Sequence, residues 1–492
     1  MITFVTRHDN ESVCIRTIVN QLIEQGIRFR GWEEQELPRE IPPDFESYPA
    51  LIADEEILRD ADEGMRRRLN AYASRSYVYI IGRDAADPAL PLRAAEDFFA
   101  VELNVFQAAS GLKREEFPAL PDKVIIDGFF RRAEEYFATV PGRKFFNEYH
   151  LHFLIGCMAL EGTPFAPQGW TERIDAAMES MFRHEDIQGD HDQVAAWMLA
   201  RTCFQRTGNK RPVEFLVRLC DELIRRRPRT AEGLPGPGGF ADDPLLFSLA
   251  DTDLFGRNAF TTARRDLVLN EQLHYLGGTF AAAAAVTSDM KYLKEACALL
   301  DHIEQVHRDP ADGLLFHASR RGEIIGVKWG RGNTHALLGA FYMLRTFPEM
   351  PAGEKEKVVA FLDRSGRALR NVQSESGFWR NILNAPDAPD ETSCTVIITA
   401  IYAWGVNNGL FDRDFYLPMI RRARNAVKRK FWRGYGSGNC RGTLPAYKNP
   451  DYYVTRGQHI QVMPLITLAL VESAKTLEIF DNDPAPQGDA SL

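Results

Sequence analysis

The feature that most constrains the fold is a long succession of amphipathic segments that begins near residue 120. Apolar residues recur there with the period of an α-helix, whereas strand-like runs nearly disappear. Several segments are apolar around most of their circumference, as in VIITAIYAWGV at 396–406, and a helix of this kind must be buried. The predicted helices lie at 123–139, 146–160, 171–183, 191–206, 211–227, 270–286, 289–307, 332–346, 353–371, 392–407, 414–430 and 458–477.

About a dozen helices, half of them strongly apolar, predict a mainly α fold, and specifically an (α/α)6 barrel over residues 120–480. In this fold six inner helices form a ring and six outer helices surround it. Hydrophobic residues make up 45% of the 492 residues, which is enough for such a core. The alternative is an α-solenoid, but the sequence has no fixed repeat period.

The first 115 residues have a different pattern. Apolar runs rich in β-branched and aromatic residues lie at 2–6, 50–54 and 76–82, and helical patterns at 12–25 and 55–72 separate them. This alternation predicts a small α/β domain with a parallel sheet. It contains neither GxGxxG nor GxxxxGK, so we assign it no chemistry and expect a packing or oligomerisation module.

Composition excludes several classes of protein. A net charge of −9 without a long basic run argues against nucleic-acid binding. No run of about 18 apolar residues predicts a membrane span, and the first residues read as a strand and a turn rather than a signal peptide. Seven scattered cysteines without CxxC spacing favour a cytoplasmic protein over a disulfide framework. Neither HxxH nor a recurring His/Asp pair is found, so we expect no metal and no cofactor.

Polar and aromatic residues concentrate where long loops run into helices. Long loops in a compact domain are usually functional, and loops gathered at one end of a barrel would form the walls of a cleft. Asn333 or Thr334 is the expected N-cap of the helix at 332–346. The informative junctions are HD at 191–192, Glu271 in LNEQLHYL, GLLFH at 313–317, KWGRGN at 328–333, and Trp379 followed by DETS at 390–393.

Together these motifs resemble the unsaturated uronyl hydrolases of glycoside hydrolase families 88 and 105. The resemblance covers roughly residues 120–478 and includes an ending GT…YY…LALVE at 442–472. It implies a bacterial glycosidase of polysaccharide degradation whose substrate is a short oligosaccharide left by a polysaccharide lyase. Such an enzyme protonates C4 of a 4,5-unsaturated uronic acid at the non-reducing end. Water adds at C5, and the hemiketal collapses to release the remaining sugar.

The resemblance also implies roles for individual residues. Glu271 would be the principal acid/base, and Asp192 would orient water or sugar hydroxyls. Arg331 would pair with the uronate carboxylate, because a guanidinium binds a carboxylate through two parallel hydrogen bonds. The other residues expected to contact substrate are His191, His274, His317, Trp329, Asn333, His335 and Trp379.

Two positions depart from the family pattern, which has Asp where Glu271 stands and usually an aromatic residue where His335 stands. Glu271 and Asp192 would also suit helix N-termini simply as acids that complement the helix dipole. The alternative to a substrate-binding role is a structural ion pair for Arg331 and packing in the core for Trp329 and Trp379. The alternative functions are a glycosidase acting on saturated uronides, such as a glucuronidase, and a non-catalytic carbohydrate-binding protein.

Overall fold

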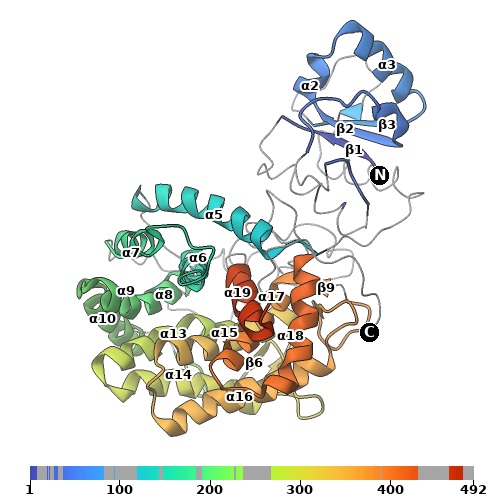
Figure 1. Cartoon of the computed structure of the whole chain (residues 1–492). Helices are drawn as coiled ribbons and strands as arrows, with labels where there is room; N and C mark the ends of the chain where they lie inside the picture. Colours follow the sequence, from blue (N-terminus) through green and yellow to red (C-terminus); the bar gives the residue numbers. More distant parts are fainter. Residues whose placement is uncertain are drawn as a thin grey trace. The chain divides into compact units, whose positions relative to one another are not determined.

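The computed structural model of the chain contains two compact units, drawn in Figure 1. The first unit comprises Met1–Gly128, Lys428–Arg441 and Asp483–Leu492, and the second comprises Phe129–Val427 and Gly442–Asn482. The residues described are 1–7, 19, 22, 27–31, 37–81, 93–94, 119–142, 148–183, 191–226, 229–235, 267–388, 390–429 and 465–479.

The first unit contains a parallel sheet in chain order. Its strands are β1 (Thr3–Val5), β2 (Ala50–Asp54), β3 (Tyr77–Ile81) and β4 (Arg93–Ala94). The first three lie within a residue of the predicted runs, because β-branched and aromatic residues suit a buried parallel strand. Apolar side chains of these strands pack with those of the following helices into one core.

The helix predicted at 55–72 is wrong as a single element. The structure has α2 (Glu55–Arg59) and α3 (Glu63–Ala73), with a break between them. A second helix begins after Asp62, because its side chain accepts a hydrogen bond of 2.7 Å from the Met65 backbone N–H and caps α3. The helix predicted at 12–25 falls mainly outside the described residues.

Helices dominate the second unit and occur where the periodicity predicts them. The bounds are α5 (Asp122–Thr139, which begins in the first unit), α6 (Glu148–Ala159), α7 (Trp170–Met181), α8 (His191–Ala196), η3 (Trp197–Leu199), α9 (Ala200–Thr207), α10 (Arg211–Arg226), α13 (Asn270–Thr287), α14 (Met290–His302), the π-helical η5 (Ile303–His307), α15 (Gly330–Thr346), α16 (Ala352–Asn371), α17 (Thr392–Asn407), α18 (Arg413–Lys428) and α19 (Leu465–Leu477). Of the last predicted helix, 458–477, residues 458–464 lie outside the described part.

Alternate helices form a closed inner ring. Its members are α6, then α8 continued by η3 and α9, then α13, α15, α17 and α19, and α19 packs on α6 to close the ring (Figure 1). Nearly all residues of α15, α17 and α19 are buried, as their apolar circumference requires. The prediction of a mainly α, barrel-like helical domain is therefore confirmed.

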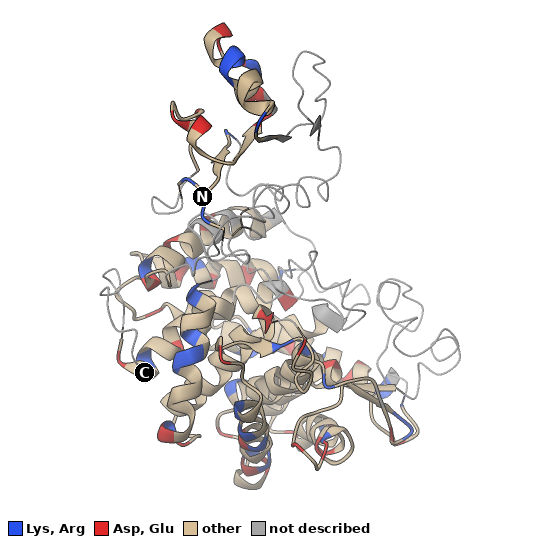
Figure 2. Ribbon diagram, turned by 90° about the vertical axis from the view of Figure 1, so that its right-hand side faces the viewer, with Lys and Arg blue, Asp and Glu red and all other residues tan. Residues whose placement is uncertain are grey.

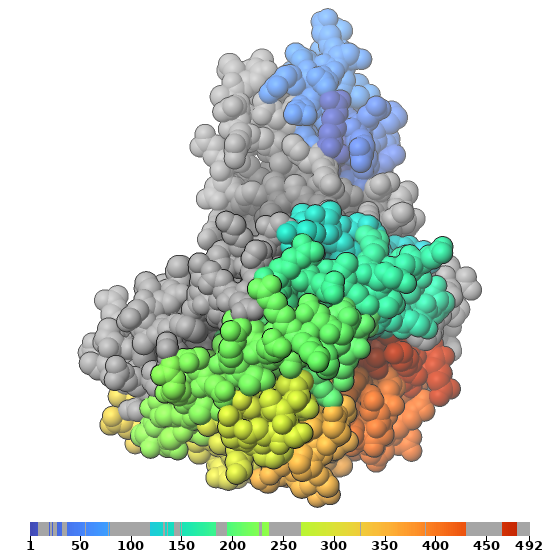
Figure 3. Space-filling model, turned by 90° about the vertical axis from the view of Figure 1, so that its left-hand side faces the viewer, coloured from blue at the N-terminus to red at the C-terminus, as the bar shows by residue number. Residues whose placement is uncertain are grey.

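The outer helices have an amphipathic pattern instead. In α16 and α18, charged residues recur along the sequence between apolar positions, and Figure 2 marks them along the ribbon. The outer helices α7 and α10 lie on the face shown in Figure 3, where both are coloured green. The outer helix α18 is held to the inner helix α19 by Arg424, whose Nη1 donates to Leu470 O and Ser473 Oγ at 2.7 Å each.

Helices α13 and α15 approach each other unusually closely. A Cβ placed on Gly339 of α15 would lie only 2.5 Å from the backbone carbon and oxygen of Leu273 in α13. Gly277 lies on the same contact, since its Cβ would come within 3.3 Å of Gly339 O. The missing side chains let two helix backbones touch, and this contact sets the first turn of α13 against the second and third turns of α15.

Short strands connect the loops to the inner helices. Strands β5 (Leu267–Leu269), β6 (Ala318–Arg320) and β7 (Glu323–Ile325) form an antiparallel sheet, and β8 (Trp379–Arg380) pairs with β9 (Asp390–Glu391). Strand β5 runs directly into α13, and β9 runs into α17. These strands therefore fix where two inner helices begin. Within the described residues, no helix combines the length and apolar character that crossing a bilayer requires.

Candidate active site

The candidate site is built from the first turns of α13 and α15 and from the loop that precedes β6. Helix α15 begins at Gly330 with Trp329 as its N-cap, so the predicted cap by Asn333 or Thr334 is wrong. The Asn333 side chain instead accepts from Leu315 N (2.9 Å) and donates to Leu315 O (2.7 Å) and Trp329 O (2.9 Å). Its amide is used to hold the loop on the helix, which is a positioning role.

Both glycines of KWGRGN are explained by close contacts. A Cβ on Gly330 would lie 2.5 Å from Arg380 O. A Cβ on Gly332 would lie 2.9 Å from the Trp329 ring and 3.0 Å from the His317 ring. Glycine at 332 therefore allows the Trp and the His to pack against the start of the helix, where larger residues would separate them.

Glu271 is the centre of the site. It is the second residue of α13, and its side chain is 15% exposed. The two carboxylate oxygens lie 2.8 and 3.0 Å from His317 Nε2, and His335 Nδ1 lies 3.2 Å from Oε1. Three residues from α13, the loop and α15 thus form one compact acid–imidazole group, and all three were predicted as site residues.

The electrostatic setting keeps Glu271 ionised. Burial alone would raise its pKa, but attraction by His317 and His335 and the hydrogen bond from His317 outweigh burial and hold the pKa well below its ordinary value. Burial lowers the pKa of His335 in spite of the neighbouring carboxylate. The free protein therefore presents a carboxylate at this point, ready to accept a proton.

Trp329 and Arg331 lie beside this group. The Trp329 ring meets His317 edge to face at 5.0 Å and His335 at 6.0 Å, and its Nε1 donates to Asn381 Oδ1 at 3.0 Å. The Arg331 guanidinium lies over the same ring, with Cζ 5.3 Å from the centroid. Arg331 is 7% exposed. The tryptophan therefore orients both the imidazoles and the guanidinium.

A buried hydrogen-bond chain fixes the start of α13. His302 Nε2 and His307 Nε2 each lie 2.9 Å from Ser319 Oγ, and His307 Nδ1 lies 2.7 Å from Asn270 Oδ1. The Asn270 amide donates onward to Phe316 O at 3.1 Å. This arrangement is consistent with a neutral His307 that donates through Nδ1 and accepts through Nε2. It anchors the residue that immediately precedes Glu271.

Sequence analysis missed one cluster beneath this group. Glu148 and His152, one turn apart on α6, lie with His274 of α13, and all three are buried. The Glu-x-x-x-His spacing on a helix was the available signal, but its partner stands more than a hundred residues away. His274 was expected to contact substrate, yet it is 0% exposed and stacks on His335 at 5.3 Å.

Trp379 is not brought to the site. It is 0% exposed, its Nε1 donates to Leu369 O at 2.8 Å, and its backbone N–H donates to Thr395 Oγ1. Its place in the structure is the core, which was the alternative considered for it. The nearby Glu391 is also buried, and its carboxylate caps α17 by accepting from Ser393 N and Cys394 N.

His191 and Asp192 are the first two residues of α8, but their side chains lie outside the described part of the structure. Helix α8 packs beside α13, since Val194 O accepts a hydrogen bond of 3.0 Å from Thr279 Oγ1. The distance between the Asp192 and Glu271 carboxylates therefore stays a prediction.

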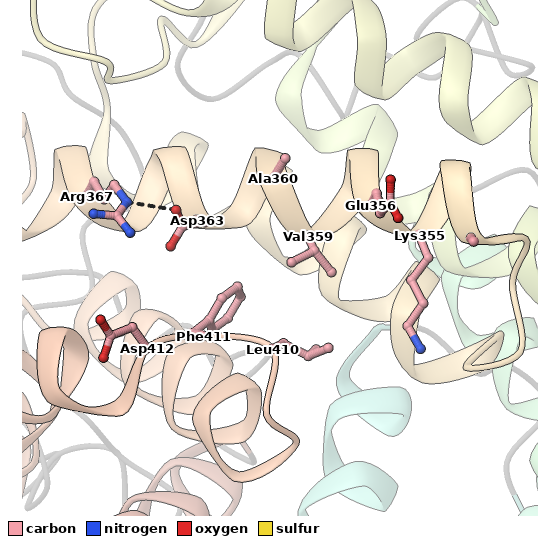
Figure 4. A pocket seen from close by; sticks show the side chains of 10 residues that line it. Lys355, Glu356, Val359, Ala360, Asp363, Arg367, Leu410, Phe411 and Asp412 are labelled. Carbon is pink, nitrogen blue, oxygen red and sulfur yellow. Dashed lines mark hydrogen bonds and ion pairs between the residues drawn. The ribbon is translucent and has the colours of Figure 1, made fainter.

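A surface groove elsewhere lacks comparable chemistry. It lies between α16 and the segment before α18 and has a volume of about 560 Å³ (Figure 4). Arg367 and Asp363 form an ion pair of 2.7 Å on one wall, and Leu410, Phe411 and Asp412 form the other. The groove contains none of the site residues described above.

Comparison with known proteins agrees with the motifs. The model of Glycosyl Hydrolase Family 88 matches residues 274–473. An unsaturated 3S-rhamnoglycuronyl hydrolase of Formosa agariphila is 36% identical over 106 residues, which are 20% of this chain and 27% of that protein. The unsaturated rhamnogalacturonyl hydrolase YesR of Bacillus subtilis is 32% identical over 104 residues, 20% of this chain and 29% of the relative. These matches thus span less than a third of each relative.

Solved structures show the same fold at low identity. A possible member of the GH105 family from Salmonella enterica superposes with a TM-score of 0.55 at 17% identity and covers 68% of this chain and 84% of that one. A family 88 glycosyl hydrolase from Bacteroides vulgatus has a TM-score of 0.52 at 13% identity and covers 73% and 100%. The predicted resemblance is therefore confirmed: the helical part of this chain is similar to the unsaturated uronyl hydrolases of glycoside hydrolase families 88 and 105, with residues 274–473 matching family 88.

Proposed function

We propose that the protein is a glycoside hydrolase that removes a 4,5-unsaturated uronic acid from the non-reducing end of short, lyase-derived oligosaccharides. The observation that carries the proposal is the Glu271 carboxylate held by His317 and His335, with Arg331 over Trp329 beside it. The group combines a proton carrier with a cation for an acidic sugar. The match to family 88 and the named relatives support the same reaction.

In the proposed reaction Glu271 delivers a proton to C4 and then accepts one from the water that adds at C5. A low pKa keeps the carboxyl group of the free protein in the base form, whereas the first step needs the acid form. A uronate that approaches Glu271 adds a second negative charge, which raises the pKa of the carboxyl group and favours its protonation. Substrate binding would thus favour the protonated form of Glu271 that the first step requires.

The other side chains have supporting roles in this proposal. Arg331 pairs with the substrate carboxylate, and Trp329 keeps the guanidinium in place. His317 and His335 hold the Glu271 carboxylate in one orientation and stabilise its charge after the proton has left. Asp192 is proposed to orient water or the sugar hydroxyls, and His191 to hydrogen-bond the substrate.

The test is spectroscopic. The double bond of the unsaturated uronate is conjugated to its carboxylate and absorbs in the ultraviolet, so turnover removes the absorbance. We expect loss of absorbance with unsaturated disaccharides from pectin-type or glycosaminoglycan-type lyase digestion. A protein that leaves the absorbance of every such substrate unchanged would refute the proposal.

The replacement of the family Asp by Glu271 favours one alternative, hydrolysis of saturated uronides. That reaction requires a second carboxyl group, which acts as nucleophile or base at a defined separation from the first. Turnover of an aryl glucuronide, without turnover of unsaturated sugars, would select this alternative. Binding of either sugar without turnover would identify a carbohydrate-binding protein.

We further propose that the protein acts in the cytoplasm. The five cysteines within the described residues are free and buried, as suits a reducing compartment. Oligomerisation through the N-terminal α/β unit is part of the same proposal, and the molar mass in solution with and without residues 1–115 tests it.

A further inference from the structure

A buried group of two imidazoles and one carboxylate lies in the interior of the helical ring. Glu148 opens α6, His152 follows one turn later, and His274 comes from the first turns of α13. Their exposed fractions are 2%, 0% and 0%. Since α8 separates α6 from α13 in the ring, these side chains meet inside it rather than at a contact between neighbouring helices.

The two separations between Glu148 and the imidazoles are those of ligands rather than of hydrogen bonds. Glu148 Oε1 lies 3.6 Å from Nε2 of both His152 and His274, and one donor atom from each residue lies within 4.8 Å of the others. A hydrogen bond would measure about 2.7–3.2 Å. Two atoms bound at about 2.0–2.1 Å to one tetrahedral ion lie roughly 3.4 Å apart.

His274 provides an independent observation. Its ring is fully buried, and neither nitrogen has a hydrogen-bond partner among the residues that the structure describes. Buried polar groups in native proteins are nearly always satisfied, because burial without a partner is costly. One of the two nitrogens, Nε2, is directed at Glu148, at a separation too long for a hydrogen bond.

We propose that Glu148, His152 and His274 bind a divalent transition-metal ion, and that Zn²⁺ is the expected occupant. Two imidazoles and a carboxylate suit Zn²⁺, whereas Mg²⁺ and Ca²⁺ prefer a shell of oxygen atoms. Three protein ligands leave a further coordination position for water. The site goes beyond the proposed glycosidase activity and does not depend on it.

The ion would lie one imidazole ring away from the candidate catalytic group. His274 stacks on His335 at 5.3 Å, and His335 Nδ1 is 3.2 Å from Glu271 Oε1. A bound ion would fix the His274 ring and, through this stacking, the position of His335. It would also tie α6 to α13 across the interior of the ring.

The experiment uses the full chain after treatment with a chelator, followed by titration with Zn²⁺ or with Co²⁺ as a visible probe. We expect one ion per chain by elemental analysis after gel filtration, and a Co²⁺ d–d absorption band typical of a four-coordinate nitrogen–oxygen site. Glu148→Gln and His274→Ala should each weaken binding by more than the roughly 100-fold that outer-sphere substitutions cost. Glu172→Gln is the control, because Glu172 is exposed in the first turn of the outer helix α7, away from the group, and this variant should bind like the wild type.

Circular dichroism and thermal unfolding without metal establish that each variant is folded. If His274→Ala does not fold, Glu148→Gln, which preserves the side-chain volume, decides alone. A wild-type chain that retains no ion after gel filtration would overturn the proposal, as would undiminished binding by the folded variants. An active enzyme that binds no ion in the titration refutes only the metal site, whereas an inactive protein that binds one ion refutes only the proposed activity.

Discussion

At the scale of single residues, the site depends on a carboxylate whose charge is stabilised by two imidazoles. Replacement of Glu271 by Gln keeps the shape of the side chain but removes the proton carrier. We expect the turnover rate to fall by roughly 10²- to 10⁴-fold, the usual contribution of a general acid–base group. The decrease in ultraviolet absorbance of an unsaturated disaccharide measures the rate.

Glu172→Gln on the outer helix α7 is a matched control, because Glu172 is exposed in the first turn of that helix. It should have the rate of the wild type. Glu271→Gln with unimpaired turnover would show that the acid is another residue, and Asp192 would then be the first to examine.

Arg331 has a distinct expected signature. Its substitution by Gln should raise KM for a uronate-bearing substrate by roughly 10- to 100-fold, because a hydrogen bond to a charged group contributes about 1.5–3 kcal/mol. Arg331→Lys should lie between wild type and Arg331→Gln, since it keeps the charge but loses the planar fork above Trp329. Initial rates over a range of substrate concentrations separate KM from kcat. Lower stability with unchanged KM would instead indicate a structural ion pair.

At the scale of elements, the close approach of α13 and α15 should tolerate no side chain. Gly339→Ala would place a methyl group 2.5 Å from the Leu273 backbone, and we expect a loss of about 1–3 kcal/mol in the free energy of unfolding. The methyl group would also push Glu271 and His335 apart and lower activity. Denaturant titration measures the first effect and the absorbance assay the second.

Gly353→Ala in α16 is the control for this substitution. A Cβ there meets nothing within 4 Å, so the exchange should stabilise the protein by up to about 1 kcal/mol through helix propensity. Equal effects of the two substitutions would contradict the claim that the helix contact, rather than helix propensity, determines the cost at Gly339.

The helices were predictable because each carries its own periodic pattern, and the starts of α13 and α17 were predicted at their observed residues. The start of α15 was not predicted correctly. Asn333 is a residue type that often caps a helix, but in the structure its side-chain amide forms hydrogen bonds with the backbone of Leu315 instead. Trp379 was misleading for a similar reason: an aromatic residue in a loop motif suits either a sugar or a core. The group of Glu148, His152 and His274 could not be predicted from the sequence, because only the folded ring brings α6 and α13 together and no local sequence pattern links them.

At the scale of the whole molecule, buried histidines should make stability depend on pH. Burial, with repulsion by His302 and His317, lowers the pKa of His307 to about 3, against roughly 6.5 in an unfolded chain. Below pH 6.5 the imidazole of His307 is protonated in the unfolded chain but stays neutral in the folded protein. The free energy of unfolding therefore decreases as the pH falls toward 3. This group alone should remove about 2 kcal/mol between pH 7.5 and pH 5.

His307→Asn tests this linkage. The substitution should lower the free energy of unfolding at pH 7.5 because the hydrogen bonds to Asn270 and Ser319 are lost. It should also make the decrease between pH 7.5 and pH 5 smaller than in the wild type by about the same 2 kcal/mol. Denaturant titrations at both pH values measure the difference, and parallel decreases in the two proteins would exclude His307 as the source.

The contact of α19 with α6 has a consequence for synthesis. Helix α6 ends at Ala159 and α19 begins at Leu465, so the last helix of the inner ring is synthesised some three hundred residues after the first one, on which it packs. While the ribosome is still translating, the apolar faces of the earlier helices have no final neighbour and are exposed to other nascent chains. Because the two helices that close the ring are synthesised so far apart in time, we expect the protein to fold slowly and to depend on chaperones.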